Sequence, residues 1–256
     1  MKIGIVTGAS SGLGREFVRQ VDTQEKLDEI WVIARRKERL KELAEQTKTR
    51  LRPLPLDLTE KSCIQALADL LEQEKPDIRL LINAAGFGKI GDFRQISHQD
   101  CSNMIDLNCR AVVEVTALAL PYMREGARVL EISSTSAFQP FPGLNVYAAS
   151  KAFLLRYSRA LRWELFGSGV GVTAVCPYWI KDTEFIPLAK DTENGQAIRH
   201  FPLASKAERV VRRALRDSRL GLAVSTPGPV CTLHRITAKF IPHCIMMALW
   251  EGLRRI

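Results

Sequence analysis

The sequence predicts an α/β fold, a doubly wound parallel sheet covered by helices on both faces. Two observations lead to this prediction. Short, almost uninterrupted apolar segments alternate with longer amphipathic segments from the first residues onward. The first apolar segment, Lys2–Thr7, runs directly into a glycine-rich turn that opens a helical stretch. Strands written as apolar runs are typical of parallel sheets buried on both faces, and right-handed crossovers make such a sheet doubly wound.

The alternation sets the expected order of elements. Strands are expected at 2–7, 30–34, 51–56, 79–83, 128–133, 169–176 and 220–226. Helices are expected between them at 15–22, 37–48, 62–73, 112–123, 146–166 and 206–219. No internal repeat, low-complexity tract or linker divides the 256 residues. We therefore expect one domain over 1–226, followed by a helical extension over 227–256.

Composition disfavours several classes of function. The chain has a net charge of +9 but contains no nucleic-acid-binding motif. The basic residues of 206–219 are most simply the solvated face of an amphipathic helix. The six cysteines show no C-x-x-C spacing, so we expect reduced thiols and no metal site. No apolar stretch approaches the roughly 20 residues of a membrane span. A strand that starts at Lys2 leaves no room for a targeting segment, which predicts a cytoplasmic protein.

The turn after the first strand has the composition of a dinucleotide-binding site. It reads Gly8-Ala9-Ser10-Ser11-Gly12-Leu13-Gly14. Glycines there allow a tight turn and let the backbone approach a pyrophosphate, whose charge is favoured at the N-terminus of the following helix. The expected contacts to the dinucleotide come from Gly8, Ser10, Ser11, Gly12, Leu13 and Gly14.

The end of the second strand indicates which dinucleotide is bound. An acidic residue there binds the ribose 2′-hydroxyl and repels a 2′-phosphate, whereas this chain has Arg35 and Arg36 after Ala34. A guanidinium group binds a phosphate through paired, charged hydrogen bonds. The sequence therefore favours NADP(H) over NAD(H); the simpler alternative is two solvated arginines at a helix start.

Three residues at the expected carboxyl edge of the sheet carry the candidate chemistry. Tyr147 and Lys151 are four residues apart in an expected helix, which places them on one face within reach of each other. A tyrosine titrates at about pH 10, and a neighbouring ammonium group is expected to lower the pKa of Tyr147. Ser134 follows the strand at 128–133, where doubly wound sheets bind ligands.

Together these motifs resemble the short-chain dehydrogenase/reductase family, whose members have a Rossmann fold. The resemblance runs from residue 1 to about residue 226. Its motifs are Thr7 to Gly14, Asp57, Asn83-Ala84-Ala85-Gly86, Asn108, Ser134, Tyr147 and Lys151. The apolar helices near 111–123 and 146–166 are similar to those that pair subunits in the family, which implies a homodimer or homotetramer.

The resemblance implies a role for each residue. Tyr147 would donate the proton in reduction and accept it in oxidation, and Lys151 would lower the pKa of Tyr147 and hold the nicotinamide ribose. Ser134 would orient and polarise the substrate carbonyl, and Asn108 would hold a water that links Lys151 to solvent. The remaining cofactor contacts would come from Asp57, Leu58, Asn83, Ala84, Ala85, Gly86, Pro177 and Ile180.

Two positions depart from the family pattern. Members usually carry Pro-Gly after the sixth strand, whereas this chain reads Pro177-Tyr178-Trp179-Ile180-Lys181-Asp182-Thr183. The threonine falls one place later than usual, so no role is assigned to it. Many NADP-preferring relatives also have a basic residue in the glycine turn where this chain has Ser11, so Arg35 and Arg36 must carry the cofactor preference.

The segments that shape the substrate pocket in this family are aromatic and apolar here. They contain Phe138, Phe141, Pro142, Leu144, Tyr178, Trp179, Phe185 and Ile186. Apolar walls suit a hydrophobic substrate, which predicts interconversion of a ketone and a secondary alcohol on a steroid-like, lipid-like or aromatic molecule. One alternative is a reductase of 3-oxoacyl thioesters. Another is a non-catalytic dinucleotide-binding protein, which the presence of Asn108, Ser134, Tyr147 and Lys151 disfavours.

The tail is expected to form two short helices, 229–239 and 241–256, broken around Pro242. In the second, one face carries Ile245, Leu249, Leu253 and Ile256, with Met246 and Trp250 beside it. Docking of this face on its own domain or on a partner subunit is the simpler interpretation. The alternatives are that the basic amphipathic helix lies on a membrane surface or covers the substrate mouth.

Overall fold

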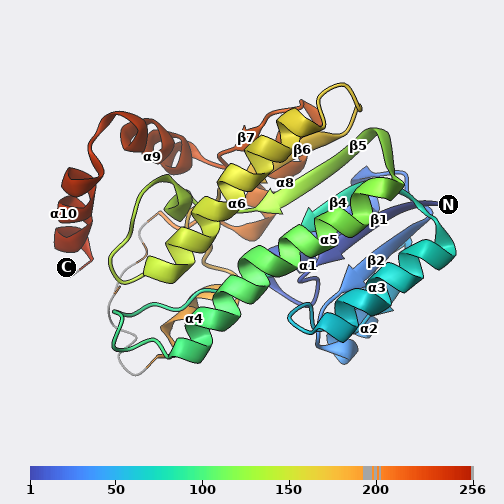
Figure 1. Cartoon of the computed structure of the whole chain (residues 1–256), viewed down its shortest axis with the longest axis horizontal. Helices are drawn as coiled ribbons and strands as arrows, with labels where there is room; N and C mark the ends of the chain where they lie inside the picture. Colours follow the sequence, from blue (N-terminus) through green and yellow to red (C-terminus); the bar gives the residue numbers. More distant parts are fainter. Residues whose placement is uncertain (193–197, 199–200, 202, 255–256) are drawn as a thin grey trace.

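The computed structural model describes residues 1–192, 198, 201 and 203–254, and it has the predicted α/β architecture. Within these residues, seven parallel strands form one sheet in the order β3-β2-β1-β4-β5-β6-β7, with helices on both faces (Figure 1). The strands are β1 (Lys2–Thr7), β2 (Glu29–Ile33), β3 (Arg50–Leu54), β4 (Asp77–Asn83), β5 (Met123–Ile132), β6 (Gly171–Val175) and β7 (Val224–Ser225). The order reverses between β1 and β4, which is where a doubly wound sheet opens a crevice at its carboxyl edge.

The helices divide into two layers and a tail. They are α1 (Gly12–Gln24), α2 (Lys37–Ala44), α3 (Lys61–Glu74), α4 (His98–Ile105), α5 (Ala111–Ala119), α6 (Asn145–Glu164), α7 (Phe185–Lys190), α8 (Ala207–Arg219), α9 (Pro229–Phe240) and α10 (His243–Leu253). Side chains of α3, α5 and α6 share one core cluster, and those of α1, α2 and α8 share the other. The sheet separates the two clusters.

Alternate side chains of each central strand enter the two clusters. In β2, Trp31 and Ile33 belong to the first cluster, and Ile30 and Val32 belong to the second. All four are fully buried, and burying a side chain of this size stabilises the fold by roughly 1.5–3 kcal/mol. Because both faces are covered, the strand reads as a continuous apolar run rather than an alternating one.

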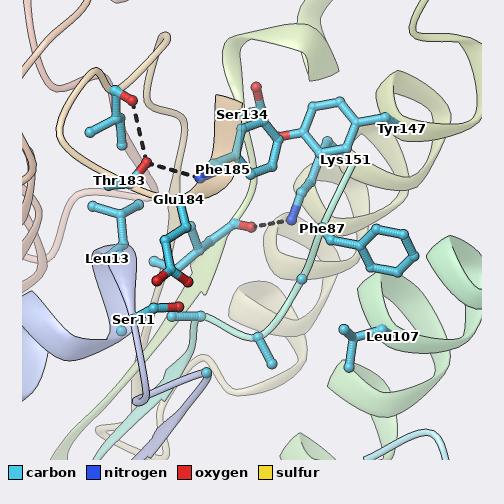
Figure 2. A pocket seen from close by; sticks show the side chains of 18 of the residues that line it. Ser11, Leu13, Phe87, Leu107, Ser134, Tyr147, Lys151, Thr183, Glu184 and Phe185 are labelled. Carbon is cyan, nitrogen blue, oxygen red and sulfur yellow. Dashed lines mark hydrogen bonds between the residues drawn. The ribbon is translucent and has the colours of Figure 1, made fainter. Parts of the chain in front are cut away.

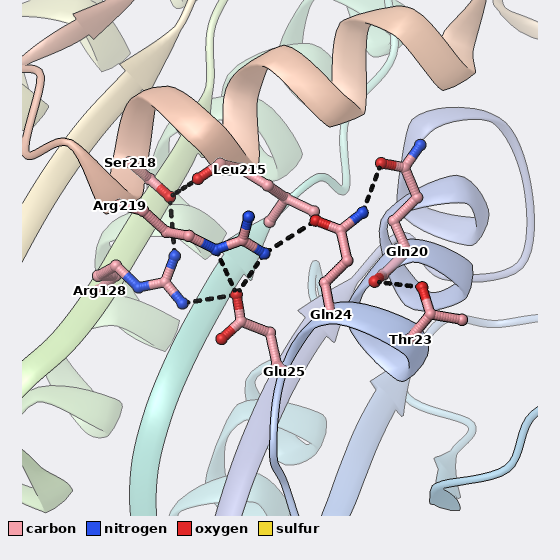
Figure 3. A network of polar contacts seen from close by, with 8 residues as sticks. All are labelled: Gln20, Thr23, Gln24, Glu25, Arg128, Leu215, Ser218 and Arg219. Atoms are coloured by element: carbon pink, nitrogen blue, oxygen red, sulfur yellow. Dashed lines mark hydrogen bonds and ion pairs between the residues drawn. The ribbon is translucent and has the colours of Figure 1, made fainter.

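A polar network joins α1, β5 and α8 near the end of α1. The carboxylate of Glu25 pairs with Arg128 at 2.8 Å and with Arg219 at 3.0 Å (Figure 3). Arg128 also donates to Ser218 Oγ at 3.0 Å, and Arg219 donates to Gln24 Oε1 at 2.8 Å. One carboxylate therefore ties the central strand β5 to helices that are distant in sequence.

Two short helices were not predicted. The helix α4 begins after Ser97, whose Oγ accepts a hydrogen bond from the backbone N–H of Asp100 at 3.0 Å. Ser-x-x-Asp before a helix is a capping signal, so this start was available in the sequence. The helix α7 has only six residues and contains Pro187, which hides it from a search for helical periodicity.

Several boundaries differ from those expected. The predicted strand 220–226 is reduced to Val224–Ser225 because Gly221 has φ +66° and turns the chain after α8. The helix predicted from residue 15 starts at Gly12, and the strand predicted to residue 56 ends at Leu54. Element ends fray and are the hardest positions to predict.

The tail forms the two predicted helices, broken around Pro242, at one end of the molecule (Figure 1). The helix α10 contacts the body through Trp250, whose Nε1 donates to the carbonyl oxygen of Pro142 at 3.0 Å. Ile245 and Leu249 of the predicted apolar face are exposed instead of docked, and Ile256 of that face lies outside the described residues. No helix in the described part of the chain is long and apolar enough to cross a membrane.

Candidate functional site

A cleft of about 650 Å³ lies at the carboxyl ends of the strands, within the roughly 300–1,000 Å³ of small-molecule sites. It brings together residues that the sequence predicts on separate elements. The predicted residues in its lining are Gly8, Ser10, Ser11, Gly12, Leu13, Gly14, Arg35, Arg36, Asp57, Leu58, Ala84, Ala85, Gly86, Ser134, Tyr147, Lys151, Pro177 and Ile180. Two predicted residues, Asn83 and Asn108, are buried outside this lining.

The glycine turn packs so tightly that two of its glycines have no room for a side chain. A Cβ on Gly14 would lie 2.3 Å from the carbonyl oxygen of Gly8, and Gly8 itself has φ +68°. The helix α1 starts at Gly12 with no capping side chain and no acidic residue in its first turn. Its first N–H groups and its positive dipole end therefore suit an anionic group in the cleft, as a pyrophosphate requires.

Arg35 and Arg36 lie beside this turn. The guanidinium group of Arg36 donates to Ser11 Oγ at 2.7 Å and to Ser10 Oγ at 3.1 Å, so it spans the turn. Arg35 is exposed and faces the carboxylate of Asp57 at 3.7 Å. Burial alone would raise the pKa of Asp57, but hydrogen bonds within its loop and the charge of Arg35 keep it below its usual value. Two cations beside the turn fit a 2′-phosphate.

Glu184 is a cleft residue that the sequence did not single out. Its carboxylate accepts hydrogen bonds from Arg39 at 2.6 Å and from Arg36 at 2.9 Å, and these bonds hold the pKa of Glu184 below its usual value. The preceding Thr183 also lines the cleft, and a Cβ on Gly12 would lie 3.6 Å from it. The loop after β6 therefore closes over the glycine turn.

Tyr147, Lys151 and Ser134 line the same cleft farther from the glycine turn (Figure 2). Tyr147 and Lys151 extend from α6, and Ser134 follows β5. The hydroxyl of Ser134 accepts from the N–H of Ser136 at 3.1 Å, which caps a short 3₁₀ turn and fixes the side chain. The hydroxyl of Ser134 is close enough to Tyr147 to lower the pKa of its phenol. Ser134, Tyr147 and Lys151, which the sequence predicts as candidate catalytic residues, therefore lie together in the cleft.

The pKa values at this point differ from the sequence-based prediction. Burial raises the pKa of Tyr147 to about 12, and the nearby hydroxyl of Ser134 only partly opposes it. The ammonium group of Lys151 donates to the carbonyl oxygen of Ile132 at 2.8 Å and lies 5.8 Å from the ring centre of Tyr147. The pKa of Tyr147 is therefore raised here rather than lowered as the sequence predicted, and burial is the main cause. Burial also lowers the pKa of Lys151 to about 8.

Asn108 lies in a π-helical turn between α4 and α5, a local distortion that is frequent at functional sites. Its side chain donates to the carbonyl oxygen of Phe87 at 2.8 Å and to Ser150 Oγ at 3.0 Å. A Cβ on Gly86 would lie 2.8 Å from Asn108 Oδ1 and 3.3 Å from Lys151 Nζ. Only glycine lets the chain pass this close to both groups, so Asn108 and Lys151 are neighbours across Gly86.

Asn83 is held beneath the cleft, which corrects the prediction that it lines the cofactor site. Its amide donates to Thr116 Oγ1 at 2.8 Å and to Glu131 Oε1 at 3.1 Å. Glu131 is fully buried, and burial raises its pKa to about 7. These buried partners turn the side chain of Asn83 away from the cleft.

The end of the cleft beyond Tyr147 is aromatic. Of the predicted pocket residues, Phe141, Leu144, Tyr178, Trp179 and Phe185 line it. Phe138, Pro142 and Ile186 do not, which corrects their assignment to the wall. Phe138 instead packs edge-on against His234 of α9, 5.7 Å between ring centres.

Trp250 of α10 supplies a further part of the wall. Its ring contacts Phe141 edge-on at 5.0 Å. The helical tail therefore forms one side of the aromatic end of the cleft. No spacing in the sequence links Trp250 to Phe141.

Among the described residues, no group of three or more His, Cys, Asp or Glu side chains is placed to hold a metal ion. All six cysteines are free thiols. Burial raises the pKa of the Cys176 thiol to about 12 and that of Cys231 to about 11. These two thiols are therefore protonated and poor nucleophiles at neutral pH.

A dinucleotide turn and a tyrosine–lysine pair on one cleft of a doubly wound sheet define the class of NAD(P)-dependent oxidoreductases. The family model described as short chain dehydrogenase matches residues 2–194, and the chain belongs to this family. The predictions of the family and of the fold class are confirmed.

Individual relatives are similar over most of the chain. Sulfoacetaldehyde reductase 2 from Chromohalobacter salexigens is 36% identical over 192 residues, covering 72% of this chain and 74% of the relative. A short-chain dehydrogenase from Sphingobium yanoikuyae, solved with NADPH, has a TM-score of 0.78 and 26% identity, and the match covers 100% of this chain and 94% of that one. The bulky-bulky ketone specific alcohol dehydrogenase from Comamonas testosteroni has a TM-score of 0.74 and 25% identity, over 93% and 92% of the two chains.

Proposed function

We propose that this protein is an NADP(H)-dependent oxidoreductase that interconverts a ketone and a secondary alcohol on a bulky hydrophobic substrate. The observation that carries the proposal is one cleft with arginines and a glycine turn at one end, aromatic side chains at the other, and Tyr147 between them. A carbonyl group held among the aromatic side chains would lie beside Tyr147. Such positioning is a large part of catalysis.

The nucleotide end of the cleft supports NADP(H) as the cofactor. Arg35 and Arg36 supply positive charge for the 2′-phosphate, and the first N–H groups of α1 supply donors for the pyrophosphate. The NADPH bound by the Sphingobium relative agrees with this assignment. The nicotinamide, when bound, supplies or takes up the hydride.

Tyr147 is the proposed general acid and base. With a pKa of about 12, its phenol is protonated at neutral pH and can donate a proton to the oxygen of a carbonyl that is being reduced. Oxidation requires the reverse transfer, so it is favoured at higher pH. Lys151, with a pKa of about 8, carries a proton at neutral pH and can replace the one that Tyr147 donates.

Ser134 and Asn108 are the proposed supporting residues. Ser134 is fixed by Ser136 and lies beside Tyr147, so its hydroxyl can orient the same substrate oxygen. Asn108 and Lys151 both border Gly86. We assign to Asn108 the positioning of a water that would exchange protons with Lys151.

The aromatic end of the cleft supports a bulky hydrophobic substrate. Phe141, Trp179, Phe185 and Trp250 line it, and apolar walls with few polar groups select for apolar surface. The substrates named for the relatives range from sulfoacetaldehyde to bulky ketones. The substrate proposal therefore rests on the cleft, and the Comamonas relative agrees with it.

The alternatives remain a reductase of 3-oxoacyl thioesters and a non-catalytic dinucleotide-binding protein. The first would use the same Tyr147 chemistry on a thioester-linked ketone. The second would bind NADPH without turnover. The assembled Ser134, Tyr147 and Lys151 disfavour it.

The experiment is oxidation of NADPH and NADH with a panel of steroid, aromatic and medium-chain ketones and 3-oxoacyl thioesters. Tyr147→Phe serves as the control, since it keeps the ring and removes the proton. Turnover of bulky ketones that disappears in this variant supports the proposal. Turnover of thioesters alone favours the first alternative, and NADPH binding with no turnover favours the second.

We also infer a homo-oligomer. Ile105, at the end of α4, and Phe153 of α6 expose about half of their apolar side chains, and a subunit contact would cover them. Light scattering of the purified protein would give the mass, and a monomer at micromolar concentration would contradict this inference.

A further inference from the structure

The outward face of α10 has no strongly ionised side chain. Within the described part of this helix, the exposed residues are His243, Cys244, Ile245, Ala248, Leu249 and Gly252. Ile245 is 50% exposed and Leu249 is 57% exposed. The opposite side of the helix contacts the body through Trp250. One side of this helix contacts the body, and the other side exposes apolar side chains. Such an exposed apolar face indicates a binding surface.

The preceding helix has the same property. Leu233, Ile236 and Phe240 of α9 are 63%, 51% and 75% exposed, and their spacing of three and four residues places them on one side. Cys231 and His234 occupy the inner side, where His234 contacts Gln139 at 3.0 Å. Two consecutive helices therefore each expose a row of large apolar side chains.

From residue 227 to residue 250 the charge is of one sign, and Glu251 near the end of α10 is only partly exposed and is paired with Arg254. Between residues 227 and 250 there is no Asp or Glu, and the two ionised side chains are Arg235 and Lys239. Both are exposed, and Lys239 Nζ lies 5.6 Å from the ring centre of Phe240. A cation beside an exposed phenylalanine, as Lys239 is beside Phe240, is typical of helices that lie in a membrane interface, where the cation meets anionic headgroups.

We propose that α9 and α10 dock this protein on the surface of an anionic lipid bilayer. The apolar rows of Leu233, Ile236 and Phe240 and of Ile245 and Leu249 enter the interface, Lys239 beside Phe240 contacts lipid phosphates, and Arg235 adds positive charge farther round the helix. A second copy of the chain fits the same face less well. In a two-fold contact each patch meets itself, which would bring Arg235 and Lys239 toward their own copies, while Glu251, the carboxylate of α10, is already paired with Arg254.

The experiment is flotation of the full chain with phospholipid vesicles. One preparation is neutral phosphatidylcholine, and the other contains about one third phosphatidylglycerol. We expect the chain to float with the anionic vesicles at low salt, and its bound fraction to fall at least roughly tenfold on neutral vesicles or at high salt. Arg235→Gln with Lys239→Gln should remove the difference between the two lipids.

The apolar rows are tested by Phe240→Glu and Leu249→Glu. Each should lower the bound fraction at least roughly tenfold. Phe166→Glu is the matched control, because Phe166 is 82% exposed and lies outside the tail, so the same kind of change there should leave binding intact. Thermal melting confirms that all variants fold.

Three outcomes would overturn the proposal. They are no flotation of the unmodified chain with anionic vesicles, an equal loss in Phe166→Glu, and dissociation of an oligomer by Phe240→Glu or Leu249→Glu without any change in flotation. The last outcome would assign the face to a second copy. NADPH oxidation with a water-soluble ketone should be the same in every variant, which separates this test from that of the proposed function.

Discussion

The carboxylate of Glu184 accepts a hydrogen bond from Arg36 at 2.9 Å, which sets an acidic side chain beside the arginine proposed to bind the 2′-phosphate. Glu184 also pairs with Arg39 at 2.6 Å. A cofactor phosphate and Glu184 would therefore compete for the same guanidinium group. Glu184 belongs to the loop after β6 and binds Arg36, so it links the position of this loop to the cofactor preference.

Glu184→Gln should tighten the binding of NADPH. The change removes a negative charge near the 2′-phosphate and frees Arg36, so the KM for NADPH should fall by about three- to tenfold at low salt. The KM for NADH should hardly change, because NADH has no 2′-phosphate. Steady-state kinetics with both cofactors measure this. An equal effect on the two would show that Glu184 acts only by shaping the loop.

Arg36→Ala should raise the KM for NADPH by roughly 10- to 100-fold, since a charged, paired contact to phosphate is lost. The matched control is Arg39→Ala, which removes the other partner of Glu184 but not a cleft-lining residue. It should change the KM for NADPH by less than about threefold. If both variants behaved alike, the 2′-phosphate would not be bound by Arg36.

Gly86→Ala should lower kcat by roughly 100-fold. The new methyl group would lie 2.8 Å from Asn108 Oδ1 and 3.3 Å from Lys151 Nζ, and displacing catalytic groups by even about 1 Å has effects of this size. Gly252→Ala is the control, because nothing lies within 4 Å of its Cβ position in α10. It should keep full activity and melt at the same or a higher temperature. Full activity in Gly86→Ala would refute the close contact.

Glu131→Gln should stabilise the fold at pH 8 and not at pH 4. The buried carboxyl has a pKa of about 7 in the fold, above its ordinary value of 4.5, so the folded protein holds a proton that the unfolded chain releases. The free energy of unfolding therefore falls as the pH rises from 4.5, the pKa of Glu131 in the unfolded chain, to about 7, its pKa in the fold. The neutral amide avoids this loss, which we expect to be about 1–3 kcal/mol. Urea unfolding at the two pH values measures it, and an equal difference at both would exclude titration as the cause.

Trp250→Ala should impair bulky substrates more than small ones. Removing this ring opens the wall beside Phe141 and deletes apolar contact, so the KM for a bulky ketone should rise by roughly 10-fold or more, while that for a small aliphatic ketone stays similar. Trp163→Ala is the matched control, since Trp163 is exposed on α6 and outside the cleft lining. Parallel changes for both ketones would mean that Trp250 only supports the fold.

The succession of strands along the chain and the nucleotide turn could be predicted because their determinants are local. The apolar run of β1, the tight Gly8-to-Gly14 turn and the spacing of Tyr147 and Lys151 each lie within a few residues of one another. Parallel topology then brings these segments to one edge of the sheet. The last strand was overestimated because the φ +66° of Gly221 is a backbone property that its apolar neighbours do not reveal.

Contacts between distant segments could not be predicted in the same way. Arg36 and Glu184 are separated by 148 residues, and Trp250 and Pro142 by 108. The pKa of Tyr147 is raised rather than lowered because burial, which is a property of the whole fold, is its largest cause, and no local spacing reveals that burial. Asn83 was misplaced for a related reason, since Thr116 and Glu131 come from other elements.

Leu249 and Trp250 are consecutive residues of α10, yet one faces outward and the other lines the cleft. A bilayer that covers the first would lie only one helix thickness from the second. A lipid-dissolved ketone could then reach the cleft by lateral diffusion, without crossing bulk water. Turnover of such a ketone would follow its mole fraction in the lipid rather than its total concentration, and adding inert lipid would slow the reaction by surface dilution.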